Sequence, residues 1–281
     1  MECTWSHALR LRGAETLHVV DNGQLKACHS FRPATSPRQD PMSCLVCQSN
    51  AAQIYKQMAV PFRGLGDWIP HQVRAPIAAW ADALAPDELL QAEWDGQPIG
   101  SWSRSSAHTQ FRQTRLDLTD PEVVRVTRDV VHSCALVYEG VRHLLDDWRP
   151  DRMVTINGRW YPHWTAVELC KQKGIPFLTH ERGLQKSTVR YADGGRTHEL
   201  GMFRDYWKDW GGVPLTVDQL RYADKVLNDR RWGRNYTWLV SSPKPQDPAE
   251  VRARLGLDER PLVAVYTSSG DETAAFEDRN R

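Results

Sequence analysis

The stretch RMVTINGRWYPHWTAVELCKQKGIPFLTHERG, residues 152–183, decides the fold. Its opening run, 152–156, is short and largely apolar and predicts a buried strand, which Asn157-Gly158 then breaks. Residues 162–173 predict a helix, which ends at Gly174 because glycine adopts the left-handed conformation that stops helices. The run 175–179 predicts the next strand. A strand, a helix and a strand with short connections favour two parallel strands joined by a right-handed crossover.

A long helix is expected just before this stretch. Apolar residues recur at helical spacing from 123 to about 147. Thr119 can cap this helix, Pro121 suits its first turn, and Glu122 completes a capping box. Residues 121–180 therefore give the order helix, strand, helix, strand. This order predicts an α/β fold with a Rossmann-like parallel sheet flanked by helices.

Weaker signals place further elements along the chain. They predict strands at 16–20 and 261–266, helices at 49–58, 215–231 and 247–256, short helices near 75–85 and 86–94, and a loop over 28–50. The strand at 261–266 runs into a loop with helix-start character, which indicates the opening of a second α/β unit. We therefore predict two domains, a Rossmann-like domain at 1–245 and a linker helix with the start of a second Rossmann-like domain at 246–281.

Composition excludes several classes of protein. The 281 residues are 41% hydrophobic and 25% charged, which is typical of a globular chain and not of a disordered one. With 36 basic and 35 acidic side chains, the net charge is +1. Domains that bind nucleic acid are usually clearly basic, so the charge does not indicate nucleic-acid binding. No apolar run approaches the roughly 18 residues of a membrane span, and the first residues do not resemble a secretory signal. We predict a cytoplasmic protein.

Two polar clusters directly follow the two predicted parallel strands: Asn157-Gly158-Arg159 and His180-Glu181-Arg182. Ligands of open α/β sheets bind at the carboxyl ends of the strands, so both clusters should line one rim. The guanidinium groups of Arg159 and Arg182 can bind phosphate or carboxylate through paired N–H donors. His180 or Glu181 could act as general acid or base. The alternative is a buried polar network that only braces the loops, in which arginine neutralises Glu181.

The cysteines form the second candidate site. Cys44 and Cys47 have the spacing of a chelating hairpin, and Cys28 lies upstream, so the three are candidate ligands of a structural zinc ion. His29 or Cys3 could supply the fourth ligand. The alternative is a pair of loop cysteines kept reduced. A redox pair is less favoured, because the motif does not follow the first strand of a thioredoxin-like pattern.

The loop 267–270 is the third candidate. Ser268 and Ser269 could bind phosphate through their hydroxyls and the backbone N–H groups of a helix start. The loop lacks the lysine of a P-loop and the spacing of a dinucleotide fingerprint. An ordinary helix cap is the alternative.

A family resemblance rests on four motifs, Ile156-Asn157-Gly158-Arg159, Ala166-x-Glu168-x-Cys170, Gly174-Ile175-Pro176 and His180-Glu181-Arg182-Gly183, together with the stretch 263–274. These motifs resemble the N-terminal half of bacterial capsule and surface polysaccharide biosynthesis glycosyltransferases of the GT-B-like, two-Rossmann architecture. The cysteines at 28, 44 and 47 also resemble those of some members. The usual first strand is missing before Trp5, and the second domain would stop soon after it begins, which suggests a fragment.

The resemblance implies transfer of a sugar from a nucleotide-sugar donor to a surface or capsule glycan. The donor would sit mainly on the C-terminal domain, and residues 1–245 would serve the glycan acceptor. Asn157, Arg159 and Arg182 would then line the cleft as substrate-binding residues, with His180 or Glu181 as the base. No transmembrane segment or nucleic-acid partner is expected, while a peripheral position at the inner membrane stays open.

Two other functions remain alternatives. One is a non-catalytic half that binds a glycan or acts as a scaffold, and the other is a protein related to nucleotide-sugar epimerases. Fold-level analogy does not establish an activity.

Overall fold

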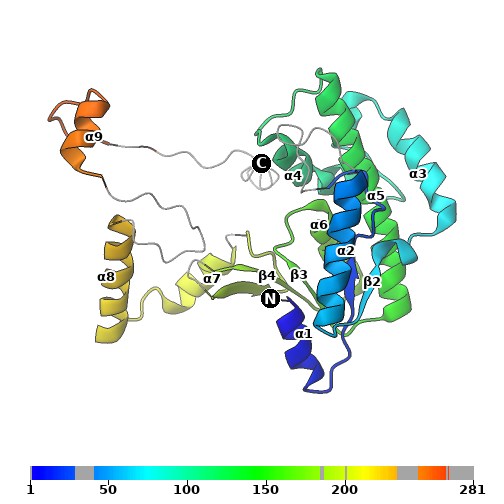
Figure 1. The fold of residues 1–281 in the computed structure, drawn as a ribbon, viewed down its shortest axis with the longest axis horizontal. Coiled ribbons are helices and arrows are strands. Elements are labelled where there is room, and N and C mark those ends of the chain that lie inside the picture. The colour runs from blue at the N-terminus through cyan, green and yellow to red at the C-terminus, as the bar shows by residue number, and fades with distance from the viewer. Residues whose placement is uncertain are drawn as a thin grey trace. The chain divides into compact units, whose positions relative to one another are not determined.

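The computed structural model describes residues 2–28, 41–183, 187–199, 201–232, 246–263 and 265 (Figure 1). In these ranges the chain is α/β. The helices are α1 (Glu2–Arg10), α2 (Pro41–Gln57), α3 (His71–Ala83), α4 (Ile99–Phe111), α5 (Pro121–Trp148), α6 (Tyr161–Lys173), α7 (Gly201–Trp210), α8 (Val217–Arg231) and α9 (Pro248–Arg254), with 3-10 turns at Leu65–Asp67 and Pro86–Glu88. The strands are β1 (His18–Val20), β2 (Phe62–Gly64), β3 (Met153–Ile156), β4 (Phe177–Arg182) and β5 (Val189–Asp193).

The chain divides into two compact units. Among the described residues, unit 1 comprises 2–153 and 158–177, and unit 2 comprises 154–157 and 178–265. The predicted domain boundary at residue 245 lies outside the described residues and stays a prediction.

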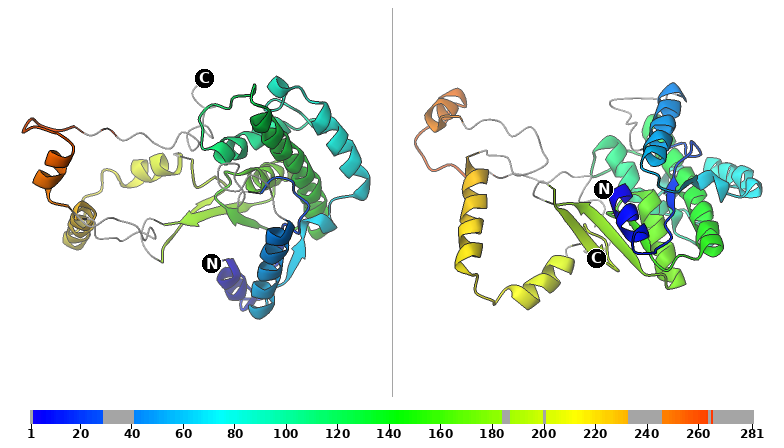
Figure 2. Two further views of the ribbon diagram at one scale, coloured as in Figure 1. Left: turned by 45° about the horizontal axis from the view of Figure 1, so that its top comes forward. Right: turned by 60° about the horizontal axis from the view of Figure 1, so that its bottom comes forward.

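Unit 1 is built around α5. This helix contacts α3, α4 and α6 (Figure 2). Apolar side chains that are completely buried in unit 1 include Ile77, Leu89, Ile99, Val130, Val131 and Val167. Helix α4 also buries several polar side chains, among them Ser103 and Ser106. The predicted cap of α5 was off by one residue. The Asp120 carboxylate, and not Thr119, accepts the first free N–H, that of Glu122, at 2.8 Å.

Unit 1 also holds a strand–helix–strand unit that the sequence only partly predicted. Strands β1 and β2 are parallel neighbours, with His18 opposite Phe62, and α2 connects them. The predicted loop over 28–50 is therefore wrong for residues 41–50, which form the first half of α2. Pro41 opens this helix, and no glycine or proline interrupts it afterwards.

The second sheet has the order β3-β4-β5. The Met153 N–H donates to the Pro176 carbonyl at 2.9 Å, and the Asn157 N–H donates to the His180 carbonyl at 2.8 Å. Because both strands advance by four residues between these bonds, β3 and β4 are parallel, as predicted. Strand β5 was not predicted, and it pairs antiparallel with β4, so this sheet is mixed.

Pairing with β5 explains why β4 is displaced from the predicted range 175–179. The ladder runs from the Leu178–Asp193 pair to the Arg182–Val189 pair, which keeps residues 180–182 in extended conformation. The cluster that was expected in a loop after the strand is therefore the end of the strand itself. The expected strand at 261–266 is wrong for its described residues. They lie outside any strand, and Val263 and Val265 are 83% exposed.

Replacing Gly100 with alanine is expected to destabilise unit 1 by about 1–3 kcal/mol. A Cβ atom there would lie 2.5 Å from the Leu89 carbonyl oxygen and 2.6 Å from the Ala92 nitrogen. Both are backbone atoms, so no rotamer change relieves the overlap, which should outweigh the roughly 1 kcal/mol by which alanine favours a helix. Urea unfolding measures the difference. Gly212→Ala, which adds a Cβ atom in open space, is the control; equal stability of the two variants would contradict this account.

Candidate functional site

The site in unit 2 begins at Asn157, the residue that ends β3. Asn157 and Gly158 both have positive φ, 22° and 75°, and this turn ends the strand at the predicted place. The Asn157 side chain is 2% exposed. Its Nδ2 donates to Oε2 of Glu181 at 2.8 Å, across the parallel pair β3–β4. The sheet therefore joins two of the residues that the sequence singled out.

The Glu181 carboxylate is contacted from three sides. Besides Asn157, the backbone N–H of Arg182 donates to Oε1 at 2.9 Å, and Nε2 of His198 lies 3.5 Å from Oε2. The last separation is that of an ion pair and is longer than a well-aligned hydrogen bond. The side chains of Glu181 and His198 are 22% and 30% exposed, so solvent or a ligand can reach both.

These contacts set the charge of Glu181. His198, followed by the Asn157 amide and the Arg182 N–H, lowers the pKa of Glu181 to about 2, against burial, which raises it. At neutral pH the side chain is therefore a carboxylate that rarely accepts a proton. Such a group is a weak general base but a good partner for an imidazole that changes charge. We call Asn157, Glu181 and His198 the carboxylate–imidazole cluster.

The loop after β5 places His198 beside Glu181. The Thr179 hydroxyl donates to the Gly195 carbonyl at 2.8 Å and accepts from the Thr197 N–H at 3.0 Å. Thr179 is completely buried in β4, two residues before Glu181. Farther along the loop, Arg196 pairs with Glu199 at 3.2 Å. His198 is the residue that sequence reasoning missed, because its placement depends on the unpredicted β5.

Thr179→Val is expected to destabilise unit 2 by about 2 kcal/mol and to release the loop that carries His198. Valine has nearly the shape of threonine but leaves the partly buried Gly195 carbonyl and the buried Thr197 N–H without their partner. Hydrogen exchange of the Thr197 amide should accelerate. Thr179→Ser keeps the hydroxyl and is the matched control. Unchanged exchange in the valine variant would show that the loop is held by other contacts.

The structure separates the other members of the second predicted cluster from Glu181. Side chains alternate along a strand, so His180 and Arg182 lie on the opposite face of β4 from Glu181. His180 is 3% exposed, whereas the Arg182 side chain is exposed. Of the two candidate bases, Glu181 therefore lies in the cluster and His180 does not.

Arg159 belongs to unit 1 and is 8% exposed. Its Nε donates to Oγ of Ser105 at 3.2 Å, and its Nη2 donates to Oγ1 of Thr109 at 3.1 Å. Ser105 and Thr109 lie one turn apart on α4 and hold the guanidinium in one orientation. Its predicted role in binding an anion stays a prediction.

The candidate zinc ligands occupy different surroundings from those expected. Cys44 and Cys47 lie in α2, one turn apart, so they do not form a loop hairpin. Within the described ranges, no group of three or more His, Cys, Asp or Glu side chains is close enough to hold a metal ion. Cys28 belongs to those ranges, whereas His29 lies outside them. The zinc site therefore stays a prediction without an assembled ligand set.

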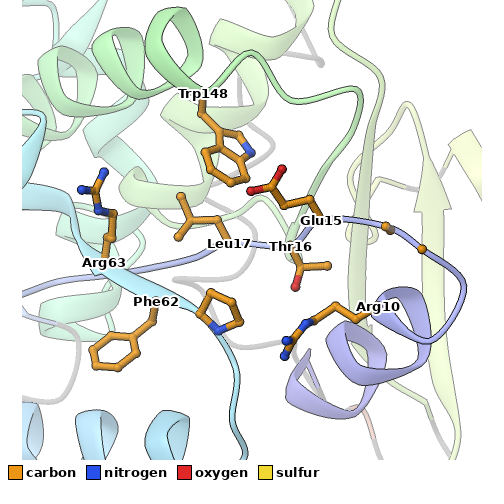
Figure 3. A pocket seen from close by; sticks show the side chains of 10 residues that line it. Arg10, Glu15, Thr16, Leu17, Phe62, Arg63 and Trp148 are labelled. Carbon is orange, nitrogen blue, oxygen red and sulfur yellow. The ribbon is translucent and has the colours of Figure 1, made fainter.

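Ser268 and Ser269 also lie outside the described residues. A pocket of about 620 Å³ that the sequence did not indicate opens in unit 1 (Figure 3). Leu17, Phe62 and Trp148 form its apolar lining, and Arg10 and Arg63 approach it from two sides. It lies at the start of β1 and β2, whereas ligands of α/β sheets bind at the carboxyl ends of strands. The carboxylate–imidazole cluster is therefore the better candidate.

Comparisons of the chain with protein-family models, with curated proteins and with solved structures found no match. No helix in the described part of the chain has both the length and the apolar character needed to cross a bilayer.

Proposed function

We propose that this chain takes part in glycosyl transfer, as the acceptor-side part of a GT-B-like enzyme that moves a sugar from a nucleotide-sugar donor to a surface or capsule glycan. The observation that carries the proposal is the carboxylate–imidazole cluster at the carboxyl ends of the parallel strands β3 and β4. Activation of a sugar hydroxyl needs a base that is held in place and reachable from solvent. His198 meets both needs, since Glu181 lies 3.5 Å from its Nε2 and its side chain is 30% exposed.

The chemistry assigns one role to each member of the cluster. With Nε2 carrying a proton toward Glu181, the lone pair on Nδ1 of His198 accepts the proton of the acceptor hydroxyl. The acceptor oxygen forms a bond to the anomeric carbon of the donor sugar as the bond from that carbon to the diphosphate breaks. The Glu181 carboxylate stabilises the imidazolium, and Asn157 holds the carboxylate. The sequence-based roles of Arg159 and Arg182 in binding phosphate stay predictions outside this cluster.

The finer architecture is part of the same proposal. A Rossmann-like domain is assembled from parallel strands connected by helices. The two parallel pairs, β1–β2 across α2 and β3–β4 across α6, are units of this kind and support a Rossmann-like arrangement of residues 1–245.

Turnover tests the proposal. The full chain is incubated with a panel of nucleotide sugars, with and without an oligosaccharide acceptor, and the released nucleoside diphosphate is measured. We expect release that depends on the acceptor. Conversion of the nucleotide sugar without an acceptor would indicate an epimerase-like activity instead. Binding of the oligosaccharide without donor consumption would indicate a glycan-binding protein, and either result would overturn the proposal.

A further inference from the structure

Cys44 and Cys47 lie in the helix of a parallel strand–helix–strand unit. Helix α2 follows β1 and precedes β2, and the two strands are parallel neighbours. Cys44 is the fourth residue of α2, and Cys47 lies one turn later. The C-x-x-C motif near such a unit is typical of thiol–disulfide proteins. The sequence argument against a redox pair was that the motif does not follow the first strand of a thioredoxin-like pattern, whereas the structure places it in the helix after β1.

The geometry of a helix brings the two cysteines close to bonding range. Three residues of α-helix rise by about 4.5 Å and turn through about 300°, which puts the two Cα atoms about 5 Å apart. Disulfides span Cα separations of about 4.4–6.8 Å. The Cβ atoms of such a pair are about 5–6 Å apart in a regular helix, while a disulfide needs about 3.5–4.5 Å. Bond formation therefore requires the first turn of α2 to tighten locally.

The first turn of α2 lies outside the buried core. None of the side chains of α2 described at 42–57 is buried, so its first turn carries no packed core residue. Cys47 is exposed, and Cys44 is partly buried. By contrast, Cys134 and Cys170 are buried, and burial raises the pKa of each thiol to about 11. Thiols of that kind are inert, because the thiolate is the reactive form.

We infer that Cys44 and Cys47 form a reversible dithiol–disulfide pair that exchanges with small-molecule disulfides such as oxidised glutathione. The exposed Cys47 thiolate attacks one glutathione sulfur, and a mixed disulfide forms as the first glutathione thiolate leaves. The Cys44 thiolate then attacks the Cys47 sulfur and expels the second glutathione. The protein loses two hydrogen atoms, and one glutathione disulfide becomes two glutathione thiols. A slightly strained, accessible disulfide of this kind is easily reduced again.

Peptide mapping tests the pair directly. Trypsin releases residues 39–56 as one peptide, QDPMSCLVCQSNAAQIYK, in which these are the two cysteines. The full chain is treated with EDTA, equilibrated with oxidised glutathione, blocked with an alkylating reagent and digested. We expect peptide 39–56 to lose two hydrogen atoms and to escape alkylation, and dithiothreitol to reverse both changes.

Two serine variants separate the steps. Cys44→Ser should trap glutathione on Cys47, whereas Cys47→Ser should carry much less glutathione on the less exposed Cys44. Cys3→Ser, which removes another partly buried cysteine, should behave like the unchanged chain. A peptide 39–56 that stays reduced while Cys3 or Cys28 is modified would overturn the inference. So would tight binding of added zinc that protects Cys28, Cys44 and Cys47 together, because the motif would then be a metal site.

Discussion

His198→Ala is expected to lower the rate of acceptor-dependent sugar transfer by about 10²–10⁴-fold, the usual contribution of a general base. Glu181 is a poor proton acceptor, because its pKa is lowered to about 2, which leaves the imidazole as the proposed base of the cluster. Loss of the imidazole leaves the acceptor hydroxyl protonated, so kcat should fall far more than the affinity for donor or acceptor. His71→Ala, which removes an exposed histidine of unit 1, is the control.

The roles of His198 and Glu181 can be separated by kinetics and by NMR. In Glu181→Gln the rate of transfer should fall, because no carboxylate stabilises the imidazolium that forms during the reaction. In His198→Ala the pKa of Glu181 should rise from about 2 toward its ordinary value of 4.5, because the largest cause of its lowering is gone. An unchanged rate in His198→Ala would remove this residue from catalysis. A raised pKa of Glu181 in the same variant would show that the contact nevertheless exists.

The elements that sequence predicted well are those with local signals. Helix α6 ends at Gly174, whose φ is 66°, as its position after an apolar periodic segment indicated. Helix α5 was predicted almost in full, because its caps and its buried face lie within the same segment. The predicted cap differs from the observed one by one residue, since Thr119 and Asp120 can both serve as caps and only the backbone conformation decides between them.

The candidate site was predicted where it depends on strand order and missed where it depends on a distant contact. Asn157 and Glu181 meet because parallel neighbours bring their carboxyl ends to one edge, a rule that needs only the order of elements. His198 reaches them because β5 pairs with β4 and because the buried Thr179 hydroxyl accepts from the Thr197 N–H, next to His198. Thr179 and Thr197 are 18 residues apart in the sequence. Strand β5, VRYAD at 189–193, has no long apolar run, and its pairing with β4 defines it.

The apolar run at 261–265 shows the opposite failure. Its composition is that of a buried strand, but the described residues of this segment have no neighbouring strand, and Val263 is 83% exposed. A strand requires hydrogen-bonding partners as well as apolar side chains. The sequence of this segment shows the apolar side chains but not whether a partner strand is present.

The free energy of unfolding of unit 1 is expected to fall by about 3 kcal/mol between pH 6.5 and pH 4 because of one histidine. His132 lies inside α5 and is 6% exposed, and its Nδ1 has no hydrogen-bond partner among the described residues. Burial, followed by the charge of Lys26, lowers its pKa from 6.5 to about 4, while Asp82 acts in the opposite direction.

The sign follows from proton binding. Between pH 4 and pH 6.5 the unfolded chain protonates this imidazole and the folded chain does not, so acid favours unfolding over this range. Above pH 6.5 the imidazole is neutral in both states, and His132 gives no pH dependence.

His132→Gln removes the titration, so the stability difference between the unchanged chain and this variant should vary with pH only below about 6.5. Urea unfolding from pH 4.5 to 8 measures it, with His71→Gln as the exposed control. A difference that is constant over this range would show that water or local opening solvates the imidazolium in the folded state.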